Sequence, residues 1–456
     1  MPLRLRPVPH GAGALRAAGA GVKPGEGAWD VVVVGAGPAG LLAAGRAAML
    51  GARVLLLEKM EKPARKLRIT GKGRANITNM KALEEQLKEI QPEPRFLRQA
   101  FQAFFNRDLI ALLEAQGVAT KVERGDRVFP ASDLAWDVAD ALVAWAGAQG
   151  VEILPHARVE RLVIHEGVFT GLGVARKSSR TPLEIEARCG ILATGGQSYP
   201  ATGSTGDGYR FAEATGHRIE ALRPSLVRIE TRPVHEGAQG LTLKNVNLTL
   251  WIDGKKQASE FGEVEFTARG LAGASVLRLS RKGVDAMAAG RMVAMTLDLK
   301  PALDPAKLEA RLARDLEAHV GGTCGPLLRS LLPTPLVAVF CERLGLGPSA
   351  PAAQIQGSKR KQLLGLLKEL RFEVTGHGSW EEAIVTAGGV SLKDIDPRTM
   401  ASRKVGNLHF AGEVLDLDAN TGGYNLQIAF STGWLAGESA ARQAVGSWLG
   451  GASLTP

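Results

Sequence analysis

The chain has 456 residues, too many for one ordinary hydrophobic core, so its length predicts two or three domains. Its 45% hydrophobic and 22% charged residues are typical of a globular protein, and no apolar run approaches the roughly 18 residues of a membrane span. The formal net charge of +10 fits either a polyanionic partner such as RNA or a solvated basic surface.

Cysteine usage and the first residues bear on where the protein resides. Cys189, Cys324 and Cys341 are widely spaced, and no CxxC or metal-ligand spacing is present. We therefore expect no disulfide and no metal, and a cytoplasmic location. Residues 1–27 are rich in Gly, Ala, Pro and Arg and contain no apolar segment of a secretory signal. They predict a disordered tail or an over-extended start of the reading frame.

A glycine-rich turn between a strand and a helix is the most informative feature. Residues 31–34 are all valine, which predicts a buried parallel strand. Gly35 permits the sharp bend, Gly37 lets the main chain approach a pyrophosphate, and Gly40 lets the helix pack close to the strand. The helix N-terminus offers N–H groups and a positive dipole end to phosphates. This context favours a dinucleotide site over any other glycine-rich turn.

A carboxylate follows the next strand. Residues 54–57 predict that strand, Gly51 ends the helix before it, and Glu58 comes directly after it. An acid at this position can accept hydrogen bonds from both hydroxyls of an adenosine ribose. It argues against a 2′-phosphate, but this unit alone does not separate FAD from NAD.

The chain then continues with mixed elements. Helices are predicted over 95–117 and 132–148, strands over 151–154 and 157–163, and an antiparallel meander over 167–176 and 183–194. Ala193, Thr194, Gly195 and Gly196 end the meander and place bare main chain near the dinucleotide, unless this is an ordinary strand-end turn.

A change of composition indicates an insertion. Residues 198 to about 300 alternate and carry many turn signals, which predicts a β-rich domain. Residues 303–371 turn helical, with helices over 327–332, 336–346 and 361–370. The segment from Ile384 is apolar and glycine-rich again and ends in a helix over 427–445, so we expect a return to the first domain.

Four strings carry a resemblance to a known family. They lie at 65–67 with 71–79, at 193–209, at 386–400 and at 410–427. The chain resembles the bacterial BaiN/RdsA family of FAD-dependent oxidoreductases, also known through the YhiN flavoproteins, from Trp29 to about Gly450. The resemblance implies an α/β fold with a Rossmann-like FAD-binding domain of the two-dinucleotide-binding type, formed by residues 28–197 and 373–456. An inserted β-rich, barrel-like domain would span 198–302, and a helical subdomain 303–372.

The turn before the C-terminal helix supplies further candidates. An acid after Gly412 can bind the ribityl chain, and the helix that Thr421, Gly422 and Gly423 open would point N–H groups at the flavin O2 and N1 region. The alternative is a glycine-rich loop without a ligand. With the resemblance, the predicted cofactor-binding residues are Gly35, Ala36, Gly37, Pro38, Ala39, Gly40, Glu58, Lys59, Lys66, Gly73, Arg74, Asn76, Val159, Ala193, Thr194, Gly195, Gly412, Glu413, Asp416, Thr421, Gly422, Gly423 and Asn425.

Lys66, Arg74 and Asn76 are the predicted catalytic candidates, as electrostatic or substrate-positioning groups. Pyrophosphate binding or simple solvation is the alternative for Arg74 and Asn76. The family often has Cys where this chain has Ala75, so a proton donor at that position is missing here.

The resemblance implies an FAD-dependent reductase in which NADPH or NADH reduces the flavin and an activated C=C bond accepts a hydride. Family members are associated with a uridine of 23S ribosomal RNA and with dehydro bile acids. The basic charge favours RNA weakly, and the strips 59–74 and 359–361 are the clusters most able to line its path. A small unsaturated metabolite stays open as the substrate, and so does a non-catalytic flavin-carrying, RNA-binding or redox-sensing protein. No membrane or metal partner is expected.

Overall fold

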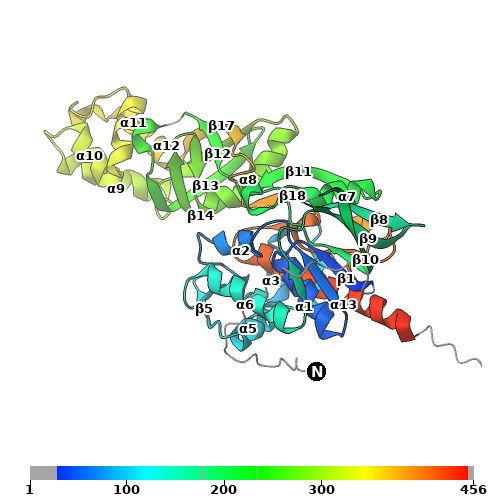
Figure 1. The fold of residues 1–456 in the computed structure, drawn as a ribbon. Helices are drawn as coiled ribbons and strands as arrows, with labels where there is room; N and C mark the ends of the chain where they lie inside the picture. The colour runs from blue at the N-terminus through cyan, green and yellow to red at the C-terminus, as the bar shows by residue number, and fades with distance from the viewer. Residues whose placement is uncertain (1–27, 177–178, 234, 450–456) are drawn as a thin grey trace, which may run out of the picture. The chain divides into compact units, whose positions relative to one another are not determined.

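A computed structural model describes residues 28–176, 179–233 and 235–449 of the chain (Figure 1). The chain forms two compact units: residues up to Arg223 together with those from Val385 onward make the first, and Pro224–Ile384 make the second. The first unit is therefore built from two stretches that are far apart in sequence. The tail predicted for residues 1–27 lies outside the described residues.

A mostly parallel sheet forms the centre of the first unit. Its spatial order is β7 (Glu152–Leu154), β2 (Val54–Leu57), β1 (Trp29–Val34), β10 (Ser179–Leu192), β9 (Val168–Arg176) and β8 (Val159–His165), and β19 (Leu408–Phe410) also pairs with β10. β1 pairs in parallel with both β2 and β10. Its valines are buried because neighbouring layers cover both faces, as in parallel sheets generally. The strands predicted at 31–34 and 54–57 are confirmed, and so is the Rossmann-type α/β fold.

Two helices close on each other beside this sheet. α1 (Pro38–Met49) follows β1, and α13 (Tyr424–Leu449) is the last described helix. A Cβ atom at Gly433 would lie 2.2 Å from the Ala39 carbonyl oxygen, and one at Gly437 would lie 2.2 Å from that of Ala43. Only glycine fits at these two positions, so the close approach of the helices is fixed by the sequence.

The helix predicted over 95–117 is broken. The structure has a 3-10 turn at Pro94–Leu97, then α4 (Arg98–Ala103) and α5 (Asn106–Ala115). Phe104 is extended, with φ −158° and ψ 116°, and the Asp108 side chain accepts a hydrogen bond from the Phe105 N–H to start the second helix. Both segments keep the same apolar periodicity, which is why the pattern alone predicted a single helix.

Shorter elements complete this part of the unit. α6 (Ala135–Ala148) agrees with the helix predicted over 132–148 and packs Trp145 against Gly45, where a Cβ would lie 2.3 Å from the indole. The remaining elements are α2 (Arg65–Ile69), α3 (Leu83–Leu87), the sheet of β3 (Thr78–Asn79), β6 (Arg127–Pro130) and β5 (Thr120–Glu123), and the pair of β4 (Ile90–Gln91) with β20 (Asp418–Ala419).

The second unit contains a closed barrel. Its order is β12 (Ile229–Arg232), β15 (Gly270–Ala272), β14 (Lys255–Thr267), β13 (Thr242–Ile252), β16 (Val293–Asp298) and β17 (Leu370–His377). β13 and β14 join through Asp253 and Gly254, which both have positive φ, as a tight hairpin turn requires. α8 (Ala274–Ala288) packs against the barrel and was not predicted.

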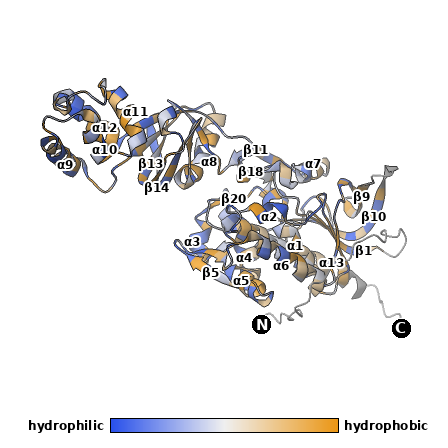
Figure 2. Cartoon of the chain, turned by 60° about the vertical axis from the view of Figure 1, so that its left-hand side comes forward, coloured by the Kyte–Doolittle hydropathy of each residue, from blue (hydrophilic) through white to orange (hydrophobic). Residues whose placement is uncertain are grey.

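Four helices lie between β16 and β17 in the chain: α9 (Pro305–Ala318), α10 (Cys324–Leu331), α11 (Thr334–Leu344) and α12 (Gly357–Lys368). Hydrophilic and hydrophobic residues lie side by side along them (Figure 2). Their buried faces, including Leu308 and Phe340, join the barrel strands in one hydrophobic core. The barrel and the helices are thus one compact unit rather than two.

The unit boundaries differ from the predicted domain boundaries. Residues 198–223 lie in the first unit and form α7 (Asp207–Ala214) and most of β11 (Ile219–Ser225), which pairs with β18 (Val385–Val390). Residues 373–384 lie in the second unit because β17 closes the barrel after the helices. No described helix has the length and apolarity to cross a membrane.

Candidate functional site

The glycine turn after β1 has two crowded positions and one open position. A Cβ at Gly35 would lie 2.5 Å from the Ala193 carbonyl oxygen, and one at Gly40 would lie 1.8 Å from that of Gly35. At Gly37 a Cβ would meet nothing within 4 Å. α1 has no side-chain cap at Gly37, has Pro38 in its first turn and carries no acid there. The first turn of α1 thus begins beside open space at Gly37, and a helix N-terminus next to such space suits a phosphate.

Glu58 is held by main-chain hydrogen bonds at the end of β2. Its Oε2 accepts from the Ala36 N–H at 3.0 Å, and its Oε1 from the Met60 N–H at 2.8 Å. Burial raises the pKa of the Glu58 carboxyl, although these hydrogen bonds oppose the shift. Each carboxylate oxygen keeps acceptor capacity for a further donor such as a ribose hydroxyl. Turn and acid together fit the adenosine diphosphate half of FAD.

The segment after β10 packs against this turn. The buried Ala193 donates from its N–H to the Val34 carbonyl at 2.9 Å, and Gly195 has φ +73°. Thr194 Oγ1 is buried without a hydrogen-bond partner among the described residues, and a Cβ at Gly208 would lie 2.0 Å from it. The Thr194 hydroxyl thus faces the start of α7. Val159 is a buried residue at the start of β8.

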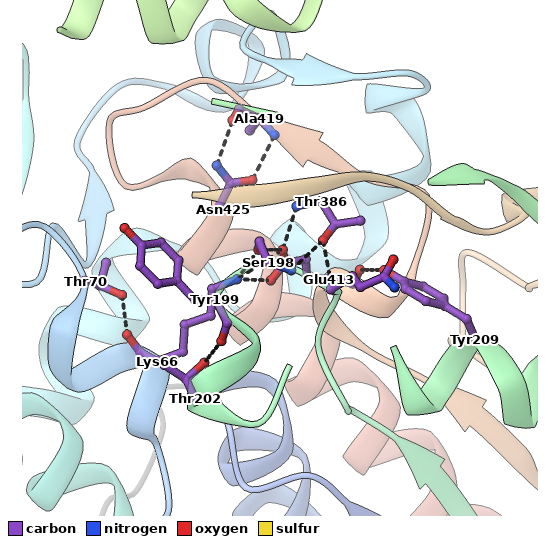
Figure 3. Close-up of polar contacts among 11 residues, drawn as sticks. Lys66, Thr70, Ser198, Tyr199, Thr202, Tyr209, Thr386, Glu413, Ala419 and Asn425 are labelled. Atoms are coloured by element: carbon purple, nitrogen blue, oxygen red, sulfur yellow. Dashed lines mark hydrogen bonds and ion pairs between the residues drawn. The ribbon is translucent and has the colours of Figure 1, made fainter. Parts of the chain in front are cut away.

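A polar network joins α2 to the turn after β19 (Figure 3). Lys66 Nζ donates to Ser198 Oγ at 2.7 Å and to Glu413 Oε2 at 2.9 Å. Glu413 Oε1 accepts from Ser198 Oγ at 3.1 Å and from the Thr386 N–H at 2.8 Å. The lysine charge is therefore balanced by a carboxylate that also accepts hydrogen bonds from Ser198 and Thr386.

The surroundings fix this network in place. Gly412, with φ +78°, lies so close to α1 that a Cβ would be 2.8 Å from that of Ala39. Thr386 Oγ1 accepts from the Gln197 N–H at 2.8 Å, and the Tyr209 hydroxyl donates to the Glu413 carbonyl at 3.3 Å. Ser198 and Thr386 are site residues that the sequence patterns do not predict, although both lie in the strings that carry the resemblance.

Lys59 also has internal partners. Its Nζ donates to Asp207 Oδ2 at 2.6 Å and to the Thr205 hydroxyl. Burial raises the pKa of the Asp207 carboxyl, but the hydrogen bond and charge of Lys59 outweigh it and hold the pKa below its usual range. Lys59 thereby ties the end of β2 to the start of α7.

The loop after α2 places its predicted catalytic groups in structural contacts. Arg74 donates from Nη2 to Asp133 Oδ1 at 2.6 Å and pairs with Glu123 as well. The Asn76 amide, with its nitrogen towards the Thr78 and Val128 carbonyls at 3.1 and 3.2 Å, accepts from the Gly423 N–H at 3.0 Å. Both side chains therefore hold the loop instead of pointing unpaired at a ligand.

Gly73 and Ala75, which flank Arg74, differ in their surroundings. A Cβ at Gly73 would meet nothing within 4 Å, so the main chain there borders open space. Ala75 is fully buried, with φ +55°.

The remaining candidates lie at the start of α13. Asn425 accepts from the Ala419 N–H at 2.9 Å and donates to its carbonyl at 2.7 Å, which fixes β20. Asp416, Thr421 and Gly422 are half-buried in the same turn. In the first unit the structure thus brings the four strings together around α1, α2 and α13.

The predicted strip at 359–361 is mostly engaged as well. Lys359 Nζ donates to the Leu344 carbonyl at 2.8 Å and so caps α11, while Arg360 Nη2 donates to the Glu309 carbonyl at 3.4 Å. Charge reversal there would disturb the packing of α9, α11 and α12 itself. No group of three or more potential metal ligands gathers in the described parts of the chain.

Comparison with known proteins agrees with this architecture. The pattern of the HI0933-like protein Rossmann domain matches residues 29–439. The chain belongs to this family. A 3-dehydro-bile acid delta(4,6)-reductase of Clostridium scindens is 28% identical over 414 residues, which cover 90% of this chain and 98% of the relative. A ribosomal RNA dihydrouridine synthase of Escherichia coli is 30% identical over 407 residues, which cover 89% and 96%.

A second ribosomal RNA dihydrouridine synthase, from Haemophilus influenzae, is 29% identical over 415 residues. The resemblance to the BaiN/RdsA family is confirmed, and the chain is a flavoprotein oxidoreductase with a Rossmann-type fold.

Proposed function

We propose that this protein binds FAD and uses NADPH or NADH to reduce an electron-poor C=C bond. The open main chain at Gly37, combined with the Glu58 carboxylate held by two N–H groups, carries this proposal. A turn that needs glycine for packing at Gly35 and Gly40 has a structural reason at both positions. Packing does not require glycine at position 37. The free space beside Gly37 instead matches what a pyrophosphate needs.

Different residues would bind different parts of the cofactor. The first turn of α1 would hold the pyrophosphate, Glu58 the adenosine ribose, and the turns at Gly412 and Gly422 the ribityl and pyrimidine region. FAD, when bound, supplies hydride transfer in both directions. Lys66 Nζ, fixed by Ser198 and Glu413, would place a positive charge beside the ring system.

Saturation of a C=C bond also requires a proton, and this chain must supply or admit it. The family often has Cys at position 75. Ala75 has no ionisable group, so it cannot donate this proton. Lys66 is engaged with Glu413 and serves as an electrostatic group rather than as an unpaired acid. Water that enters beside the open main chain at Gly73 is the simplest proton source in this arrangement.

We infer that the favoured substrate is a uridine of ribosomal RNA, whose C5=C6 bond is conjugated to a carbonyl. Two relatives are named for that reaction, and the net charge of +10 suits a polyanion. A bile-acid-like enone is the alternative, supported by the Clostridium relative. Both substrates share a polarised C=C bond, so the same flavin site serves either.

An anaerobic titration tests the reductase. Purified protein should be yellow, release FAD rather than FMN on denaturation, and lose its flavin absorbance when NADPH or NADH is added. Flavin that stays oxidised with both donors would favour a non-catalytic flavin carrier.

Mass spectrometry of large-subunit ribosomal RNA from a deletion strain then tests the substrate. One dihydrouridine should revert to uridine. Unchanged RNA, together with enone-dependent reoxidation of the reduced enzyme, would favour a small metabolite.

A further inference from the structure

Exposed apolar side chains lie on several segments of the first unit that meet at one loop. Among its described residues, five large hydrophobic side chains are strongly exposed: Ile69 (48%), Val122 (57%), Leu134 (53%), Trp136 (48%) and Val168 (38%). All except Val168 belong to segments that meet at the loop after α2. We call these four side chains the Trp136 surface. Gathered exposed hydrophobic side chains mark interaction sites more often than scattered ones do.

Main-chain and ionic contacts show that the segments that carry these four residues meet at this loop. Gly73 donates to the Ile69 carbonyl at 3.3 Å and accepts from the Ala135 N–H at 2.7 Å. Arg74 pairs with Asp133, next to Leu134, and with Glu123, next to Val122. The same loop therefore holds together α2, β5 and the start of α6.

Trp136 is fixed although half of it is exposed. The Arg68 guanidinium lies 4.4 Å from the centre of the indole. Arg68 is 7% exposed, pairs with Asp140 at 2.7 Å and donates to the Pro63 carbonyl at 3.2 Å. An aromatic ring that is already immobilised loses little entropy when a partner stacks on it.

Unpaired cations lie on and next to α2, in the same part of the unit. Lys62, Arg65 and Lys72 are exposed and make no ion pair with any residue that the structure describes, whereas the other four cations of residues 59–74 are paired. Lys62 Nζ lies 5.6 Å from the indole centre. Glu61 is the exposed acid of the same stretch, so positive charge prevails there.

We propose that the Trp136 surface docks a single-stranded segment of RNA. A base would stack on Trp136, and phosphates would contact Lys62, Arg65 and Lys72. A fixed, exposed aromatic ring in a basic part of the surface is the combination that single-strand binding uses. The proposal rests on the proposed function, because α2 also carries Lys66 and so connects this surface to the candidate site.

Binding of a fluorescein-labelled oligouridylate of twelve nucleotides to the FAD-loaded full chain tests the proposal by fluorescence anisotropy. The apparent Kd should rise steeply between about 50 and 200 mM salt. Trp136→Ala should weaken binding about ten-fold or more, while Trp136→Phe should retain most of it. Lys62→Glu with Arg65→Glu should weaken binding further and flatten its salt dependence.

Matched controls separate this surface from general charge. Lys88 and Arg107 are exposed cations of the same unit without an ion pair among the described residues, and Lys88→Glu with Arg107→Glu should change binding far less. Val168→Ala, at an exposed apolar position away from the loop, should leave binding unchanged. FAD content and NADPH-dependent bleaching, measured on each preparation, report folding and the reductase separately.

The outcomes are distinct. Binding that is indifferent to Trp136→Ala and to the Lys62 and Arg65 reversals overturns the proposal, even where bleaching proves the reductase. If the wild-type protein sediments as a dimer and Trp136→Ala sediments as a monomer with unchanged RNA binding, the surface would instead contact a second copy of the chain. RNA binding at this surface without flavin reduction would keep the surface and reject the reductase.

Discussion

The glycine turn after β1 and the basic loop after α2 lie in the same unit and were both predicted to face the cofactor, yet they are built in opposite ways. At the turn, main-chain groups are exposed to open space beside Gly37. On α2 and in the loop after it, the Lys66, Arg74 and Asn76 side chains already have protein partners. A site made of main chain is free before the ligand arrives, whereas a charged side chain near it has usually found a counter-ion.

The largest expected effects separate packing from ligand binding within the turn. Gly40→Val should prevent the first unit from folding, because its Cβ would lie 1.8 Å from a carbonyl oxygen. Gly37→Val should abolish FAD binding while thermal unfolding of the apoprotein stays near wild type. Flavin content and calorimetry measure the two effects. Full flavin content in Gly37→Val would remove the phosphate assignment.

Glu58→Ala tests the predicted ribose-binding acid and should give the next largest effect on FAD binding. It should weaken FAD binding by about 1.5–3 kcal/mol, the range for hydrogen bonds to a charged group, in a dilution series. Glu58→Gln keeps the shape and should lose somewhat less. Equal FAD retention in all three proteins would mean that the ribose lies elsewhere.

The pH dependence of FAD binding sharpens the same assignment. Ribose hydroxyls donate to the ionised carboxylate, and burial raises the pKa of Glu58 in the free protein. FAD affinity should therefore fall as pH drops through this raised pKa, beginning above the usual glutamate range. Glu58→Gln should respond less over the same interval, as fluorescence titration of FAD would detect.

Lys66→Met tests the network on α2. It leaves the partly buried Glu413 without its counter-ion and should cost about 1 kcal/mol of unfolding free energy, between the values for exposed and buried pairs. It should also make the bound flavin harder to reduce, because a nearby positive charge favours the reduced anion. Denaturant unfolding and a redox titration would measure the two effects.

Arg74→Gln gives the smallest expected change. Its partners Glu123 and Asp133 are solvent-accessible and Lys121 also pairs with them, so stability and FAD content should stay close to wild type. A large fall in turnover with intact flavin would instead restore the substrate-contacting role predicted from the sequence.

The sequence predicted what depends on local patterns. The valine run at 31–34, the strand at 54–57 and the glycine spacing each follow from a few adjacent residues, and all three agree with the structure. α8 was missed because the surrounding strands dominated the composition, and β17 was not predicted because it joins the barrel only after four helices.

The contacts within the site could not be predicted without the three-dimensional fold. Lys66 and Ser198 are 132 residues apart, and Ser198 and Glu413 are 215 apart, so no local pattern could pair them. The partners of Arg74 likewise come from the strand β5 and from the turn before α6.

The crossing of α1 and α13 has a consequence for how the protein is made. The carbonyls of Ala39 and Ala43 receive Gly433 and Gly437, which the ribosome adds nearly 400 residues later. Pro224–Ile384 has its own core and can fold while translation continues. The glycine turn, by contrast, packs fully only once α13 has been made, so cofactor binding would follow the synthesis of that helix.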